Sequence, residues 1–387
     1  MTGRPAGRPV PANVSPAEAL ARFRREIDRT AVRARNGVKH LSGFSAAAVG
    51  ETPRDLVWTR DKVALFRYRP LAQGSGQPAP SLRPPAPGPR RHPPVLLVMS
   101  LVTRPYVFDL RPGNSLVARL LEDGHDVYLL DWGVPDAVEA GNTLETYCDE
   151  YLPHAARAVL DTSGAADLTL FGYCLGGVLC LLTAAGHPDL PVRNIALLAT
   201  PVDFAELGPM ANLLKTGRME PAEVLDETGN VPASTLLEGF RMMAPTGDVL
   251  TLVNLWNSFA DEEALAAHQA LVRWSGDHIP FPGAAFRQIV DLFVRRQCLV
   301  EGKVPLGGRV VDLASINVAV LDIIGTKDHL VPRAASQPLA SVLSGAALQP
   351  LHLPAGHAGL ILGRKAQRDF IPAILEWLDR HSALIPH

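Results

Sequence analysis

The segment that most constrains the fold of this 387-residue chain is a run of glycines around one cysteine, residues 171–177, Phe-Gly-Tyr-Cys-Leu-Gly-Gly. Apolar residues precede it at 168–171 and follow it at 178–182. This pattern predicts a buried strand, a tight turn and a buried helix. Glycines suit such a turn because a Cβ atom has no space beside the turning residue. We therefore expect Cys174 at a sharp strand-to-helix turn, where its thiol is presented for chemistry.

The same glycines allow another interpretation. Residues 168–186 carry no charge and contain the spacing Gly172-x-x-x-Gly176, which is found where helices meet in membranes. Glycines interrupt the stretch, and its length is marginal for crossing a bilayer. A short strand, a turn and a helix account for every residue in it. We therefore expect no transmembrane segment.

Composition and charge narrow the class of protein. Hydrophobic residues are 47% of the chain, which ensures a core, and a net charge of −2 argues against a nucleic-acid partner. Cys148, Cys174, Cys180 and Cys298 form no Cys-x-x-Cys pair and no cluster with histidines, so no disulfide framework and no metal site are expected. Residues 1–14 are polar and lack the apolar segment of a signal peptide. These features predict a cytoplasmic protein.

Apolar runs alternate with helical patterns along most of the chain, which predicts an α/β fold with a doubly wound, mostly parallel sheet. Strands are expected at 95–99, 126–131, 168–171, 195–199, 318–324 and 349–353, and helices at 115–122 and 144–160. The strand signal disappears between Pro201 and Asp312. The expected segments are an N-terminal helix and β-hairpin (1–69), a Pro-rich linker (70–94), the first part of the core (95–200), a mainly helical cap insertion (201–312) and the second part of the core (313–387).

An acid and a histidine follow late strands in the order that a nucleophile at such a turn requires. Asp328 lies in the loop after the strand 320–324, and His357 lies in the loop after the next strand. The order nucleophile, acid, histidine is that of the α/β-hydrolase fold. The sequence therefore predicts an α/β-hydrolase fold with Cys174, Asp328 and His357 as its catalytic triad.

Other residues of the same types are set aside. Asp322 falls inside a strand rather than at its end, His329 immediately follows the acid, and His352 alternates on a strand. The remaining cysteines, at 148, 180 and 298, are interpreted as small core residues, because free cysteine is among the most buried residue types.

Beyond the triad, further motifs lie at residues 104–110, 114–116, 124–133, 171–177, 200–204, 328–332 and 356–359. Together they resemble the catalytic subunit of a polyhydroxyalkanoate (polyester) synthase, a member of the α/β-hydrolase superfamily. The resemblance runs from about Pro94 to Leu378 and is most like the short class that works with a second, non-catalytic subunit. The chain departs from the family at Thr103-Arg104, where Asn-Arg is usual, and at Arg333, where an aromatic residue is frequent.

The resemblance implies a polymerising acyltransferase that acts on (R)-3-hydroxyacyl-CoA. Cys174 would carry the acyl group as a thioester, His357 would act as general base and Asp328 would orient it. The N–H groups of Leu175 and of the loop around Val102 would hold the oxyanion. No cofactor is expected, because coenzyme A enters as part of the substrate.

The expected partners are the hydroxyacyl-CoA, the growing polyester chain, a second synthase subunit and further copies of the chain in a homodimer or higher oligomer. The surface of a polymer granule in the cytoplasm is the expected location. Two alternatives stay open. The same triad would serve an intracellular polyester depolymerase or acyl thioesterase, and a non-catalytic, granule-associated scaffold would keep the fold without the chemistry.

Overall fold

The computed structural model describes residues 49–70, 93–243 and 262–381. The chain forms two compact units, one of Met1–Ala47 with Asp248–Gln269 and the other of Ala48–Gly247 with Ala270–His387. The second unit carries the sheet and the elements around it. The expected N-terminal helix and nearly all of the expected Pro-rich linker lie outside the described residues.

A sheet of eight strands forms the centre of this unit, in the order β1-β2-β6-β3-β7-β8-β13-β14. The six strands from β6 to β14 are parallel, and β1 and β2 join them as an antiparallel hairpin. The doubly wound, mostly parallel sheet is therefore confirmed. The strands are β1 (Arg54–Arg60), β2 (Val63–Tyr68), β3 (Val95–Val98), β6 (Val127–Asp131), β7 (Leu168–Tyr173), β8 (Val192–Leu198), β13 (Ala319–Gly325) and β14 (Ala347–Leu353).

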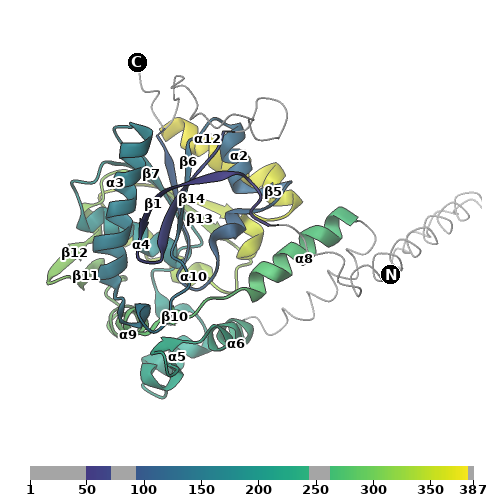
Figure 1. Cartoon of the computed structure of the whole chain (residues 1–387). Coiled ribbons are helices and arrows are strands. Elements are labelled where there is room, and N and C mark those ends of the chain that lie inside the picture. Colours follow the sequence, from purple (N-terminus) through teal and green to yellow (C-terminus); the bar gives the residue numbers. More distant parts are fainter. Residues whose placement is uncertain (1–48, 71–92, 244–261, 382–387) are drawn as a thin grey trace, which may run out of the picture. The chain divides into compact units, whose positions relative to one another are not determined.

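Helices cover both faces of the sheet, because the central strands are buried on both sides and need apolar partners there. Figure 1 shows α3 (Leu152–Ser163) and α4 (Leu175–Gly186) on one face, with α2 (Leu116–Glu122) and α12 (Ile371–His381) on the other. The Ser115 side chain caps α2 by accepting a hydrogen bond from the Ala118 N–H (2.9 Å). A π-helical stretch, Thr146–Tyr151, leads into α3.

The uncharged stretch 168–186 is strand β7, the turn at Cys174 and helix α4, as expected. Within the described residues, we find no helix both long and apolar enough to cross a bilayer. The stretch lacks charge because β7 and most of α4 are buried in the core of the protein.

Helices dominate the described part of the segment between β8 and β13. They are α5 (Pro209–Lys215), α6 (Ala233–Met243), α8 (Glu262–Gly276) and α9 (Gly283–Ile289), with a π-helical stretch at Val290–Arg295. A two-residue pair, β9 (Asn230–Val231) and β10 (Phe281–Pro282), also lies there. Beyond β13, α10 (Arg333–Ser336) and α11 (Leu339–Val342) precede β14. The boundaries of the cap stay a prediction.

Besides the β9–β10 pair, the structure has two strands between Pro201 and Asp312 that the sequence did not lead us to expect. Strands β11 (Lys303–Leu306) and β12 (Arg309–Asp312) form an antiparallel hairpin. Its turn is Gly307-Gly308, and both glycines have positive φ (57° and 74°). Tight two-residue hairpins favour this conformation, which glycine adopts without strain. The Gly-Gly pair was a hairpin signal in the sequence.

Asp322 lies in the middle of β13 and is only 3% exposed. Its Oδ1 has no hydrogen-bond partner among the described residues. Burial raises the pKa of this carboxyl from 3.8 to about 7, because the charged form is disfavoured away from water. The unfolded chain therefore releases this proton at a lower pH than the folded chain does.

Asp322→Asn is expected to stabilise the protein above neutral pH. Between about pH 4 and pH 7 the unfolded state alone ionises, so the parent loses stability as the pH rises and then levels off. The gain of the variant should grow through this range to about 4 kcal/mol. Urea unfolding at several pH values measures it, with Asp161→Asn on the exposed side of α3 as the control. A gain independent of pH would contradict the assignment.

Candidate active site

Cys174 lies between the end of β7 and the start of α4. Its backbone (φ 55°, ψ −124°) is in a region that residues other than glycine rarely adopt. The Cys174 N–H donates to the carbonyl of Leu198 (2.8 Å), and the Cys174 carbonyl accepts from the Gly177 N–H (2.9 Å). These bonds hold the strained turn, which presents the half-buried thiol at the carboxyl end of the sheet.

Two glycines make this turn sterically possible. A Cβ atom on Gly172 would collide with the backbone of Gly177, across the turn. A Cβ atom on Gly176 would collide with the carbonyl oxygen of Val98, where the first turn of α4 abuts the end of β3. The glycines in the sequence therefore mark close approaches of backbone to backbone, as expected for a nucleophile elbow.

Asp328 lies in the loop after β13, and its side chain is fully buried. Its Oδ1 accepts hydrogen bonds from the N–H groups of Leu330 and Val331, both at 2.9 Å. Its Oδ2 lies 2.7 Å from Nδ1 of His357. Because the two backbone donors fix one oxygen, the other is aimed at the imidazole.

The loops that carry the acid and the histidine are bonded to each other. The Thr326 N–H donates to the carbonyl of Leu353 (2.8 Å), and the Lys327 N–H donates to that of Ala355 (3.0 Å). These bonds extend the pairing of β13 with β14 into the loops. The relative position of Asp328 and His357 is thus set by the backbone as well as by their own contact.

His357 is mostly buried, with 13% of its side chain exposed. Burial alone lowers the pKa of an imidazole, but the charge of Asp328 and hydrogen bonds with Asp328 and Cys174 outweigh it and raise the pKa of His357 to about 10. At neutral pH the ring therefore carries a proton, the form that pairs with a cysteine thiolate. The structure brings Cys174, His357 and Asp328 into one chain of contacts, and their catalytic roles stay a prediction.

The expected oxyanion donors lie beside the thiol in the chain and in the loop after β3. Leu175 is the first residue of α4, where helical N–H groups lack a partner within the helix. Val102 is half-buried, and its carbonyl accepts a hydrogen bond from the Ile279 N–H (3.1 Å). The role of either N–H group stays a prediction.

The loop 102–106 is fastened to the segment 274–279, far away in the sequence. The sequence did not suggest this contact. Besides the bond between Ile279 and Val102, the Trp274 Nε1–H donates to the Arg104 carbonyl (3.0 Å) and the Tyr106 hydroxyl donates to Asp277 Oδ2 (3.0 Å). Nδ1 of His278 also lies 3.1 Å from the Val102 carbonyl. These contacts, named here the loop clasp, fix the loop that is expected to supply an oxyanion donor.

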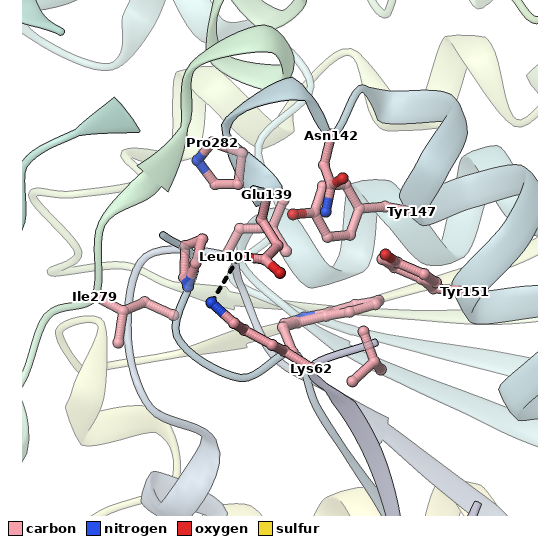
Figure 2. A pocket seen from close by; sticks show the side chains of 11 residues that line it. Lys62, Leu101, Glu139, Asn142, Tyr147, Tyr151, Ile279 and Pro282 are labelled. Carbon is pink, nitrogen blue, oxygen red and sulfur yellow. Dashed lines mark hydrogen bonds and ion pairs between the residues drawn. The ribbon is translucent and has the colours of Figure 1, made fainter. Parts of the chain in front are cut away.

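A small pocket lies beside the clasp, and none of the triad residues lines it (Figure 2). Lys62 and Glu139 form an ion pair across it, at 2.7 Å. It has room for roughly one water molecule, which excludes it as an acyl site. The lining residues are Lys62, Val63, Leu101, Trp132, Pro135, Glu139, Asn142, Tyr147, Tyr151, Ile279 and Pro282.

The residues that the sequence sets aside take no part in the contacts described above between Cys174, His357 and Asp328. Asp322 is buried within β13, His329 is exposed beside the acid, and His352 is exposed on the edge strand β14. The other cysteines, at 148, 180 and 298, are buried free thiols, as expected.

One group of metal-ligand types occurs in the described residues. Ligand atoms of Asp123, His125 and Asp379 lie within 4.8 Å of one another. Asp379 is exposed, and acidic groups of this kind are common at surfaces without an ion. We assign no metal site to them.

A strained cysteine between a buried strand and a helix, followed in the chain by an acid and a histidine, defines an α/β-hydrolase-fold protein. The model of the α/β-hydrolase fold family matches residues 93–363. The chain belongs, within this fold, to the family of poly(3-hydroxyalkanoate) polymerase subunit PhaC.

Three relatives with that name carry the assignment. The protein of Allochromatium vinosum is 33% identical over 89% of this chain and 93% of its own length. That of Synechocystis sp. is 33% identical over 89% of each chain. That of Haloferax mediterranei is 31% identical over 92% of this chain and 69% of its own length.

Proposed function

We propose that this chain polymerises (R)-3-hydroxyacyl-CoA with release of coenzyme A, through an acyl thioester on Cys174. The observation that carries the proposal is the contact chain from the Cys174 thiol through His357 to Asp328. The name of the relatives, poly(3-hydroxyalkanoate) polymerase subunit, supports the choice of substrate.

In the first step, the Cys174 thiolate attacks the thioester carbonyl and the bond from carbon to the sulfur of coenzyme A breaks. His357 gives its proton to the departing thiolate of coenzyme A, and Asp328 holds the imidazole in the tautomer that can do so. The energy of the thioester is kept, because one thioester replaces another. The N–H groups of Leu175 and Val102 would stabilise the oxyanion of the intermediate.

In the second step, the hydroxyl of another hydroxyacyl-CoA attacks the acyl group on Cys174. His357 takes the hydroxyl proton, an ester bond forms and the Cys174 sulfur leaves. The polyester, now one unit longer, is a coenzyme A thioester and can acylate Cys174 again. One coenzyme A is released for each unit added. Water must be excluded from the site, because it would otherwise hydrolyse the thioester on Cys174 before the hydroxyl attacks it.

The test supplies 3-hydroxybutyryl-CoA to the purified chain, with and without a second synthase subunit. Released coenzyme A and the size of the product are followed together. Release of coenzyme A together with formation of a polymeric product would support the proposal. Free hydroxy acid alone would replace it with a depolymerase or thioesterase activity, and no turnover in either condition would favour a non-catalytic scaffold.

The proposal includes partners and a location. A second subunit fits the word subunit in the names of the relatives. We also propose a homodimer or higher oligomer. The proposed location is the surface of the polymer in the cytoplasm, where an insoluble polyester would accumulate. Analytical ultracentrifugation of the chain alone and with a second subunit tests the assembly.

Trp274→Phe is expected to lower kcat for coenzyme A release by about tenfold, with a smaller change in KM. The variant removes the indole donor to the Arg104 carbonyl and loosens the loop clasp. A displaced oxyanion donor stabilises the transition state less, even where substrate binding persists.

The matched control is Trp377→Phe on α12. Trp377 is 1% exposed, and its Nε1 has no hydrogen-bond partner among the described residues. Both variants remove a similar buried volume, and only one removes a bond of the clasp. Equal losses of kcat in the two variants would refute a role of the clasp in the reaction.

A further inference from the structure

Tyr173 ends strand β7 and directly precedes Cys174. Its ring is fully buried. Its hydroxyl donates a hydrogen bond to the backbone carbonyl of His357 at 3.1 Å, across 184 residues of sequence. The residue beside the thiol therefore holds the backbone of the histidine that contacts the same thiol.

The ring of Tyr173 also contacts the imidazole of His357. The two rings are stacked, with centroids 4.9 Å apart and planes 25° from parallel. Phe108 packs against Tyr173 with ring centroids 6.0 Å apart, and Phe108 in turn meets Phe171 edge to face. Tyr173 is thus fixed by the core and offers one aromatic face to the histidine.

The local backbone of His357 gives it little other support at this point. His357 precedes a single 3₁₀ turn, Ala358–Leu360, and its carbonyl also accepts from the Leu360 N–H at a long 3.4 Å. The bond from Tyr173 is shorter and comes from the rigid centre of the sheet. It therefore limits how far the histidine backbone can move relative to Cys174.

A positively charged ring is favoured over the face of an aromatic side chain, because the face carries negative charge. His357 is charged at neutral pH, since Asp328 raises its pKa to about 10. The stacking therefore favours the imidazolium that the first step of the reaction uses.

We infer that Tyr173 is a positioning residue of the reaction: its hydroxyl anchors the backbone of His357, and its ring supports the imidazolium against Cys174. This inference rests on the proposed function, in which Cys174 and His357 carry out acyl transfer. It assigns a task to the residue before the nucleophile, which the elbow motif by itself leaves unspecified.

Tyr173→Phe separates the two contributions, because it keeps the ring and removes the anchor. We expect kcat for coenzyme A release to fall by about tenfold to a hundredfold with KM nearly unchanged, the size of effect expected when a catalytic group is displaced by up to about 1 Å. Tyr173→Leu removes ring and hydroxyl, and kcat should fall further.

Alkylation of Cys174 by iodoacetamide, followed by mass spectrometry of the peptide, supplies a readout independent of turnover. Its rate as a function of pH reports the titration of the pair that Cys174 forms with His357. We expect the pH of half-maximal rate to rise in Tyr173→Phe and to rise further in Tyr173→Leu. A tyrosine needed only for folding would lower the melting temperature and leave this pH unchanged.

Tyr128→Phe on β6 is the matched control. Tyr128 is fully buried in the same sheet, two positions from β7 in strand order, and its hydroxyl lies 3.4 Å from Asp126. Its alkylation profile and kcat should equal those of the parent. A Tyr173→Phe variant with the parent's kcat and profile would overturn the inference alone, whereas full activity in Cys174→Ala would overturn the proposed function.

Discussion

Cys174→Ala is expected to lower coenzyme A release from 3-hydroxybutyryl-CoA by about 10⁵-fold to 10⁶-fold, the loss seen when a triad loses its nucleophile. The thiol is the only atom of the residue that the proposed reaction uses. The strained turn is held by backbone bonds to Leu198 and Gly177, which alanine keeps. The variant should therefore fold and bind substrate while no acyl-enzyme forms.

Cys180→Ala is the control for this prediction. Cys180 lies six residues later on α4 and is completely buried, away from His357. Its replacement should cost about 1 kcal/mol of stability and leave kcat unchanged. Mass spectrometry after a brief exposure to substrate should find the acyl group in Cys180→Ala and not in Cys174→Ala. Residual turnover of more than a few per cent in Cys174→Ala would contradict the thioester mechanism.

Asp328→Asn is expected to lower kcat by about 10⁴-fold, because it imposes the wrong tautomer on the histidine. The N–H groups of Leu330 and Val331 point at Oδ1, so the amide oxygen of asparagine must take that position. The amide NH₂ then faces Nδ1 of His357 and donates to it. The ring proton moves to the other nitrogen, which can no longer accept a proton from the thiol or the hydroxyl.

Asp322→Asn is the matched control, since it replaces another buried acid, which lies within β13 rather than in the loop after it. Its kcat should stay that of the parent. Equal losses of kcat in the two variants would show that replacing either buried acid is sufficient to impair the reaction. Such a result would contradict the role assigned to Asp328.

The ion pair of Asp328 with His357 also makes the free energy of unfolding depend on pH, and the sign of this dependence follows from the raised pKa of His357. The pKa of His357 is raised from 6.5 to about 10, so the folded chain binds a proton that the unfolded chain has released between these values. Stability from this pair is fully present below about pH 6.5 and is lost as the pH rises towards 10. In Asp328→Asn the burial of the ring lowers its pKa instead. The advantage of the parent in urea unfolding should therefore shrink as the pH rises from about 6.5 to about 10.

The strands and the triad could be predicted because each has a local signal. Buried parallel strands are continuous apolar runs, and the glycines around Cys174 mark the turn. The acid and the histidine follow the ends of strands, and parallel strands bring such ends to one edge of a sheet. Topology then places Asp328 and His357 near the thiol without any contact being visible in the sequence.

The contacts that refine the site had no such signal. Tyr173 meets His357 across 184 residues, and Trp274 meets Arg104 across 170. Nothing in the immediate neighbourhood of either residue indicates its partner, because the partner is chosen by how the core packs. The backbone donors to Asp328 were equally hidden, since they depend on the conformation of one loop.

The sequence by itself therefore determined the fold class, the place of Cys174 at a strand-to-helix turn and the order in which Asp328 and His357 follow it, because these depend on the periodicity of apolar residues and on glycine at one turn. Only the tertiary structure decided how the histidine is held. The anchor from Tyr173, the two donors that aim Asp328 and the loop clasp each join segments whose distance is fixed by packing. Distances of a few ångströms decide acyl transfer, and these are properties of the packed core rather than of any short stretch of sequence.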